Sequence, residues 1–278
     1  MARINKKEWG NYVGTLRKVS KRARTEMLAF IDQYNRALDS GVISLTEYEN
    51  ALIDYAYALA TRYGEAAGAA ACEMYDATAV LQGRVLAPAA PAETATMAET
   101  AKAIKGTLKT GNPDIVADAV GRLVKQAGAD TTLQNAKRDQ AYFAWIPSGD
   151  TCAYCLALAG IGWQKAGKLT LDGGHAEHIH ANCDCTYAID FRGDLEIAGY
   201  DYNKIQQTIL EMTDDEYTAE DLLRMSGHSA KGHDHSGLNM LRRKFYADNK
   251  EIINEQKRSA YAKRIERNSS AAEEINVN

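Results

Sequence analysis

The sequence has no run of eighteen apolar residues, so it contains no segment long and apolar enough to cross a membrane as a helix. Its first sixteen residues lack the apolar core that follows the basic residues of a secretory signal. No internal repeat is present. These absences exclude the membrane and secreted classes, and we expect a soluble protein made in a cytoplasm.

Cysteine is scarce, and its distribution is uneven. Of five cysteines, four fall between Cys152 and Cys185, together with three of the six histidines. In a reducing cytoplasm, clustered cysteines are metal ligands more often than disulfides. This segment is therefore the first candidate for a functional site.

Charge is also unevenly distributed. The formal net charge is −4, but residues 1–36 carry nine Lys and Arg against three Asp and Glu, and residues 237–278 carry nine against six. The chain between these ends is acidic. Basic ends suit DNA phosphates or an acidic protein surface, although a solvated helix face explains them equally well.

The first third of the chain has the periodicity of long helices. Between Trp9 and Leu38 the apolar residues recur at steps of three and four, and turn residues follow at Asp39–Gly41. Ser44 and Glu47 have the spacing of a capping box at the start of a second, alanine-rich helix that runs to about Asp76 or beyond. We expect an antiparallel pair of long helices.

The remaining chain alternates between helical and irregular segments. Prolines interrupt residues 86–91, and we expect helices over 92–106, 113–128 and 132–143. The segment 150–193 bears glycine and cysteine, and Thr186–Ile189 fits a strand. We expect three further helices. The first covers residues 202–212, the second begins after an N-cap at Thr218, and the last covers residues 238–267.

The predicted fold class is therefore mostly α, with a long N-terminal helical region, a small α+β Cys/His module and a C-terminal helical tail. We expect the helical region over residues 1–128, the module over 129–195 and the tail, with its basic last helix, over 196–278.

The Cys/His module has the spacing of a zinc site. Cys152-x-x-Cys155 forms a knuckle that aims two sulfurs at one ion, and His180, Cys183 and Cys185 follow about 28 residues later. In an extended segment Cys183 and Cys185 point to the same face. Five soft ligands exceed what tetrahedral zinc needs, so we expect Cys152, Cys155 and Cys183 with either His180 or Cys185.

Other interpretations of the cluster stay open. In one, the thiols are simply reduced and buried and bind no metal. In another, a pair of cysteines is oxidised to a disulfide inside a virion or outside the cell. His175-Ala-Glu177 copies the H-x-E of zinc deaminases, but the order of the motifs is reversed here. The alternative function is thus a zinc-dependent nuclease or deaminase, which needs an open metal position and a base such as Glu177 or Asp150.

The residues around this cluster resemble the phage Mu protein F-like minor head proteins, the head morphogenesis family of tailed bacteriophages. The resemblance covers residues 130–190. It rests on these residues in the family's order: Asn135, Arg138, Trp145, Pro147, Asp150, Cys152, Cys155, His180, Asn182, Cys183 and Cys185. Ala181 and Asp184 depart from the family, which often has proline and arginine there.

The resemblance implies a non-catalytic minor structural protein of the phage head. Such proteins act in head morphogenesis or in genome packaging and ejection, so the implied partners are the portal protein and the major capsid protein. The implied location is the virion head, with the host cytoplasm during assembly. The Cys/His module would hold zinc as a structural ion.

The basic ends make nonspecific binding of double-stranded DNA a further expectation, because counterion release favours such contacts. No sequence-reading motif accompanies the charges. The candidate phosphate-binding residues are Arg17, Lys18, Lys21, Arg22 and Arg24 near the N-terminus, and Arg242, Arg243, Lys244, Lys257, Arg258, Lys263 and Arg264 near the C-terminus.

Overall fold

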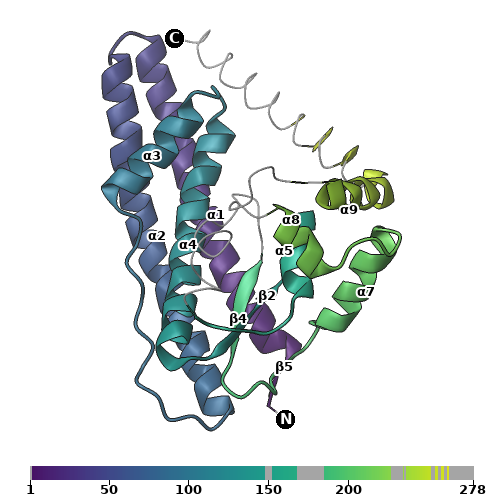
Figure 1. Cartoon of the computed structure of the whole chain (residues 1–278). Coiled ribbons are helices and arrows are strands. Elements are labelled where there is room, and N and C mark those ends of the chain that lie inside the picture. The colour runs from purple at the N-terminus through teal and green to yellow at the C-terminus, as the bar shows by residue number, and fades with distance from the viewer. Residues whose placement is uncertain are drawn as a thin grey trace.

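The computed structural model describes most of the chain. The described residues are 2–147, 152–167, 185–226, 234, 236–251, 254, 255, 258, 259 and 262. Long helices form an elongated body, and a small sheet with shorter helices lies against its lower part (Figure 1). The fold is mostly α, with a small mixed α/β region and C-terminal helices, as the sequence predicts.

The helical body consists of α1 (Lys6–Asp39), α2 (Leu45–Leu81), α3 (Met97–Leu108) and α4 (Pro113–Asp139). The predicted antiparallel pair is confirmed as α1 and α2, which join at a short turn where Gly41 has φ +72°. Asn5 with Glu8 and Ser44 with Glu47 form capping boxes that satisfy backbone N–H groups at the start of the two helices.

The third long helix, α4, packs against both α1 and α2 (Figure 1). Small residues permit this close approach: a Cβ atom at Gly128 would meet Leu16 and Ala67 at 3.4 and 3.5 Å. The largest side chains in the core of the body are fully buried, which stabilises it by removing apolar surface from water. They are Met27, Ile31, Leu52, Leu59, Ile104, Val120 and Val124.

Three expected helix boundaries are wrong. α3 begins at Met97, five residues after the expected start at residue 92, because Thr96 caps the helix. α4 continues without a break through residues 128–132, where Thr131 and Thr132 hydrogen-bond to carbonyls one turn earlier. The helix then ends at Gln140, which takes a left-handed conformation with φ 51°. Gln140 carries no sequence signal for such a cap, which glycine usually supplies. The segment expected to be helical up to Phe143 is therefore partly a strand.

An extended segment, residues 83–96, connects α2 to α3 and runs along the body. We call it the strap. Its prolines prevent helix formation, as expected. α3 begins after it at Met97, with Thr96 and Glu99 forming a third capping box.

The sheet is antiparallel and has the order β3–β2–β4, formed by β2 (Tyr142–Ile146), β3 (Gln164–Lys165) and β4 (Thr186–Asp190). Trp145 pairs with Tyr187 and Phe143 with Ile189. Alternate residues of β2 and β4 face opposite sides. Phe143, Trp145 and Tyr187 pack in one apolar cluster, and Ala144 packs in another with residues of α1. The strand predicted from Thr186 is confirmed.

A second pair of strands ties the start of the chain to the segment after β4. β1 (Arg3–Ile4) pairs in parallel with β5 (Glu196–Ile197). Ile4 and Ile197 are both buried and pack with Trp9 of α1. The N-terminal segment is thus integrated with the sheet region.

The shorter helices are α5 (Ala153–Gly160), α7 (Tyr202–Met212), α8 (Ala219–Ser226) and α9 (Ser236–Asp248). The helix predicted over 202–212 and the cap at Thr218, which bonds with Asp221, are confirmed. Gly160 lies where a Cβ atom would meet Ile209 at 2.8 Å, so α5 and α7 approach closely. Part of the predicted helix over 238–267 lies outside the described residues.

The helical body and the sheet region share helix α4 and an apolar cluster. The predicted domain boundary at 128/129 falls inside α4, and Tyr75 and Leu133 of the body pack in the same cluster as Phe143 of the sheet. Within the described residues, no helix has the length and apolar character needed to span a membrane.

Candidate functional site

Three of the predicted metal ligands meet where α5 and β4 begin. Cys152 is the N-cap of α5, Cys155 lies in its first turn, and Cys185 immediately precedes β4. These cysteines lie close together although some thirty residues of sequence separate them. Cys152 is exposed, Cys155 is fully buried and Cys185 is 8% exposed.

The start of α5 favours the thiolate form of a cysteine side chain. The backbone N–H of Cys155 donates to the Sγ of Cys152 across 3.4 Å, as expected for a side chain that caps a helix. Helix N-termini and N–H donors stabilise a thiolate relative to a thiol. Burial raises the pKa of Tyr154, between the two cysteines, and the nearby thiols raise it further.

The other predicted ligands, His180 and Cys183, lie outside the described residues, as do Asp150, His175 and Glu177. Among the residues that the structure describes, no group of three or more His, Cys, Asp or Glu side chains is placed so that it could hold a metal ion. The described cysteines thus supply part of the predicted donor set.

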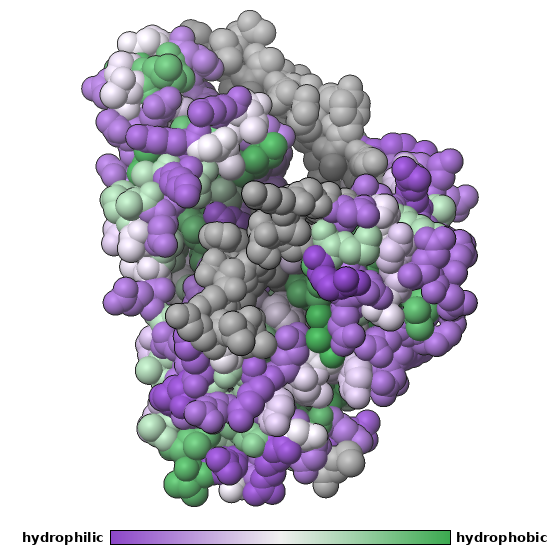
Figure 2. Space-filling view, in the orientation of Figure 1, coloured by the Kyte–Doolittle hydropathy of each residue, from purple (hydrophilic) through white to green (hydrophobic). Residues whose placement is uncertain are grey.

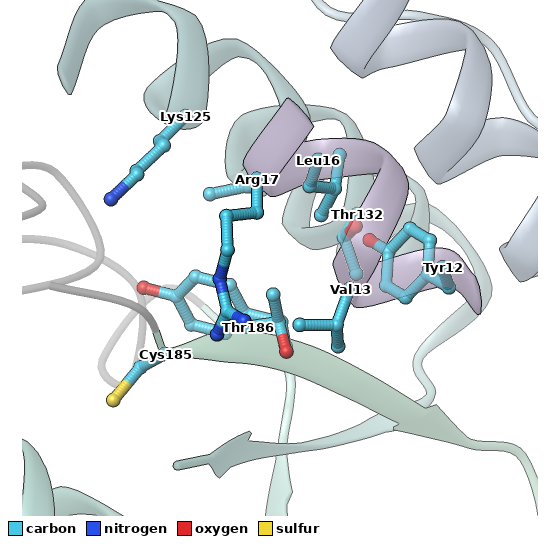
Figure 3. A pocket seen from close by; sticks show the side chains of 10 residues that line it. Tyr12, Val13, Leu16, Arg17, Lys125, Thr132, Cys185 and Thr186 are labelled. Carbon is cyan, nitrogen blue, oxygen red and sulfur yellow. The ribbon is translucent and has the colours of Figure 1, made fainter. Parts of the chain in front are cut away.

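A small cavity of about 30 Å³ adjoins Cys185, between α1, α4 and β4 (Figure 3). Arg17 of α1 and Lys125 of α4 line it, with Thr186, whose buried hydroxyl has no hydrogen-bond partner among the described residues. Figure 3 shows the Cys185 sulfur directed away from the α1 side chains. The cavity has room for water and little else.

Asn135 and Arg138, which carry part of the family resemblance, bind the strap. Asn135 is buried; its Oδ1 accepts from the Ala90 N–H at 3.0 Å, and its Nδ2 donates to the Ala90 carbonyl at 2.8 Å. Arg138 donates to the carbonyls of Ala87 and Pro88. Both side chains therefore have a structural role in fixing the strap to α4.

A buried carboxylate at the end of β4 organises the turn toward β5, and no sequence motif predicts its role. Asp190 is fully buried and accepts hydrogen bonds from the backbone N–H groups of Arg192, Gly193 and Leu195 at 2.8–2.9 Å. Gln82, the C-cap residue of α2, donates to the same carboxylate at 2.7 Å. A turn after β4 was recognisable from Gly193, but its connection to α2 was not.

The N-terminal basic residues do not form one uniform surface. Lys18, Lys21 and Arg22 are exposed on α1. Arg24 instead pairs with Asp114 and Asp118 of α4 at 2.7 and 2.5 Å. These carboxylates keep the pKa of Arg24 above its usual value despite burial. Arg24 is thus engaged within the body, unlike its exposed neighbours.

The C-terminal basic residues are placed in part. Arg242, Arg243 and Lys244 are exposed on α9, and Arg258 is exposed beyond it. Lys257, Lys263 and Arg264 lie outside the described residues. Figure 2 shows hydrophilic side chains over most of the visible face, with apolar residues in small separate patches.

These features define a class of protein: an elongated helical body joined to a small α/β region that gathers cysteines from two segments. Residues 3–212 match the model of the VG15 protein family, and the chain belongs to this family. The curated proteins and the solved structures compared with the chain include no match. The family match covers α1 to α7 and includes the cysteine cluster.

Proposed function

We propose that this protein is a minor structural protein of a tailed-phage head and acts without catalysis in head morphogenesis or in genome packaging and ejection. The observation that carries the proposal is the meeting of Cys152 and Cys155 with Cys185. It agrees with the resemblance to the Mu F-like minor head proteins, in which the same motifs occur in the same order.

The cysteine cluster fits a structural zinc ion by its donor chemistry. Cys152, Cys155 and Cys185 would supply sulfur ligands, with His180 or Cys183 completing the set. Zinc would crosslink the start of α5 to the start of β4. Because a bound structural metal adds its binding free energy to folding, this link would stabilise a small region with short strands.

The partners in this proposal are the portal protein and the major capsid protein, with double-stranded DNA bound nonspecifically. Lys18, Lys21 and Arg22 on α1 and Arg242 to Lys244 on α9 support a phosphate contact because they are exposed. The proposed location is the virion head, with the host cytoplasm during assembly. DNA retention should fall steeply as salt increases.

The direct test is quantitative mass spectrometry of purified particles from a phage that encodes this chain, with a nonsense mutant of the gene as comparison. We expect the protein in intact heads at a small fraction of the copy number of the major capsid protein. We also expect the mutant to give empty or non-infectious heads. Absence from the particles, together with normal heads in the mutant, would refute the proposal.

A second assay separates this function from a metal-dependent enzyme. Purified protein loaded with zinc should not cleave or deaminate DNA. Turnover that disappears in a Glu177→Ala variant would instead support the nuclease or deaminase alternative.

A further inference from the structure

A groove between α3 and α4 lies far from the cysteine cluster in the sequence and plays no part in the proposed zinc site. Its volume is about 620 Å³, and residues 93–96 of the strap contribute to its lining. This size is typical of sites that bind small ligands or short peptide segments. The charged and polar residues in it are Glu93, Glu99, Lys102, Arg122, Gln126 and Asp130.

A half-buried cation lies in this groove without a counterion. Arg122 of α4 has no carboxylate within ion-pair distance among the described residues. Burial alone lowers the pKa of its guanidinium. A cation that has lost part of its hydration gains when an anion pairs with it. Lys102, exposed on α3, adds a second positive charge to the groove.

A negatively charged residue, Asp130, lies about two helical turns further along α4 than the positively charged Arg122. Asp130 accepts one hydrogen bond, from Gln126 at 2.7 Å. Burial raises its pKa to about 6, and the negative charge of Glu99 on α3 contributes in the same direction. Asp130 is eight residues from Arg122, which corresponds to about 12 Å along a helix.

Small residues in the lining of the groove leave space for a peptide chain. Ala95, Ala103 and Ala127 line the groove with small side chains. Gly106 of α3 also lines it, and a Cβ atom there would meet no atom within 4 Å. An extended peptide advances about 3.3 Å per residue, so about four residues span the distance between Arg122 and Asp130.

We propose that this groove binds an extended peptide segment of a partner protein, in which an acidic side chain pairs with Arg122 and a basic side chain about four residues away pairs with Asp130. Charge complementarity selects this occupant. The carboxylates of Glu93, Glu99 and Asp130 repel a polyphosphate, so DNA is not suited to the groove. The groove's paired charges also distinguish it from an apolar docking site. This inference does not depend on the phage-head proposal.

The probe is a synthetic peptide, acetyl-Ser-Glu-Ser-Thr-Ser-Lys-Ser-amide, titrated into the full chain with isotope-labelled backbone amides. We expect chemical-shift changes at α3 and α4. A peptide of the same composition with Glu and Lys adjacent should bind at least about tenfold more weakly, because a single pair then forms at a time. Equal binding of both peptides, or no binding of the first, overturns the proposal.

Two substitutions test the site itself. Arg122→Gln should weaken binding of the probe at least about tenfold, whereas Lys137→Gln, an equal loss of charge in the last turn of α4 outside the groove, should not. Gly106→Leu should place a larger side chain in the groove and weaken binding. Leucine favours a helix over glycine, so that variant should fold at least as stably as the wild type. Unchanged binding in both Arg122→Gln and Gly106→Leu overturns the proposal.

The pH dependence gives a readout that a purely structural role would not produce. Probe binding should weaken as the pH falls from 7 to 5, because Asp130 becomes protonated and loses its charge. Glu93 and Glu99, with Lys102 and Arg122, are the other charged groups lining the groove. An Asp130→Asn variant should bind weakly with little change across this range. A pH profile equal to that of the wild type would refute the role of Asp130.

Discussion

The helical body and the cysteine-bearing sheet region are stabilised in different ways. In the body, α1, α2 and α4 bury apolar side chains along their whole length, as at Leu52 and Val120. In the sheet region, strands of two to five residues also bury apolar side chains, and the buried carboxylate of Asp190 adds a hydrogen-bonded polar centre at the end of β4. The body therefore relies on a repeated apolar pattern, whereas the sheet region combines a short apolar core with one buried polar residue.

This difference has a consequence for mutation. A periodic apolar core tolerates substitutions that conserve side-chain volume, because neighbouring side chains can repack. A buried polar centre does not, since removal of one acceptor leaves several donors unsatisfied. One polar substitution in the sheet region should therefore destabilise the protein as much as loss of a large apolar side chain from the body.

The largest effect is expected for Asp190→Ala. It leaves three backbone N–H groups without their acceptor and removes the shorter of the two hydrogen bonds that the Gln82 amide donates, which should lower the free energy of unfolding by about 3–5 kcal/mol. Urea denaturation followed by circular dichroism measures the loss. The control is Asp194→Ala. Asp194 is exposed, and among the described residues its side chain accepts only from Gln82, at 3.2 Å, so the effect should be small. Equal effects would contradict the central role of Asp190.

In the body, Leu52→Ala should lower the free energy of unfolding by about 3 kcal/mol, through lost apolar burial and the cavity left behind. Leu45, on the same helix, is 60% exposed, and Leu45→Ala should cost about 0.5 kcal/mol or less. The same urea denaturation tests both. If Leu52→Ala proved much more damaging than Asp190→Ala, the proposed contrast between the two regions would be wrong.

Asn135→Ala should lower the free energy of unfolding by about 2 kcal/mol, because the Ala90 N–H loses its acceptor and the Ala90 carbonyl loses one of its two donors. Limited proteolysis should then cut within residues 83–96 faster than in the wild type. Gln134 is exposed and also donates to the Ala90 carbonyl, so Gln134→Ala is the matched control and should leave cleavage nearly unchanged. Wild-type cleavage in Asn135→Ala would show that other contacts hold the strap.

The smallest effect is expected for Arg24→Gln. The pairs with Asp114 and Asp118 are partly exposed, so their loss should cost about 1 kcal/mol or less. DNA retention should stay near the wild-type level, because Arg24 is already paired. Lys21→Gln, which removes an exposed charge from the same helix, should reduce retention. A larger loss of retention for Arg24→Gln than for Lys21→Gln would contradict this assignment.

The same contrast explains how far the sequence predicts the fold. Apolar periodicity and capping residues define α1, α2 and α7, because these signals are local. The end of α4 could not be predicted, because Gln140 adopts a left-handed conformation that glutamine rarely takes. The aromatic residues of β2 also fit a helix as readily as a short buried strand.

For the candidate site, spacing identifies Cys152, Cys155 and Cys185, and the structure brings them together. The contacts of Asp190 with Gln82 and of Asn135 with Ala90 could not be predicted, because these partners lie 108 and 45 residues away in the chain. Their hydrogen bonds exist only once the helices have packed. The groove between α3 and α4 was likewise invisible, since it depends on how the two helices meet.

The most direct test of the zinc centre is the metal content of the purified full chain, determined by mass spectrometry after exhaustive dialysis. We predict about one zinc ion per chain in the wild type, loss of zinc in Cys152→Ser and Cys185→Ser, and retention in Cys72→Ser, because Cys72 lies on α2 outside the cluster. Zinc-free wild-type protein, or full zinc content in the Cys152→Ser variant, would contradict the account.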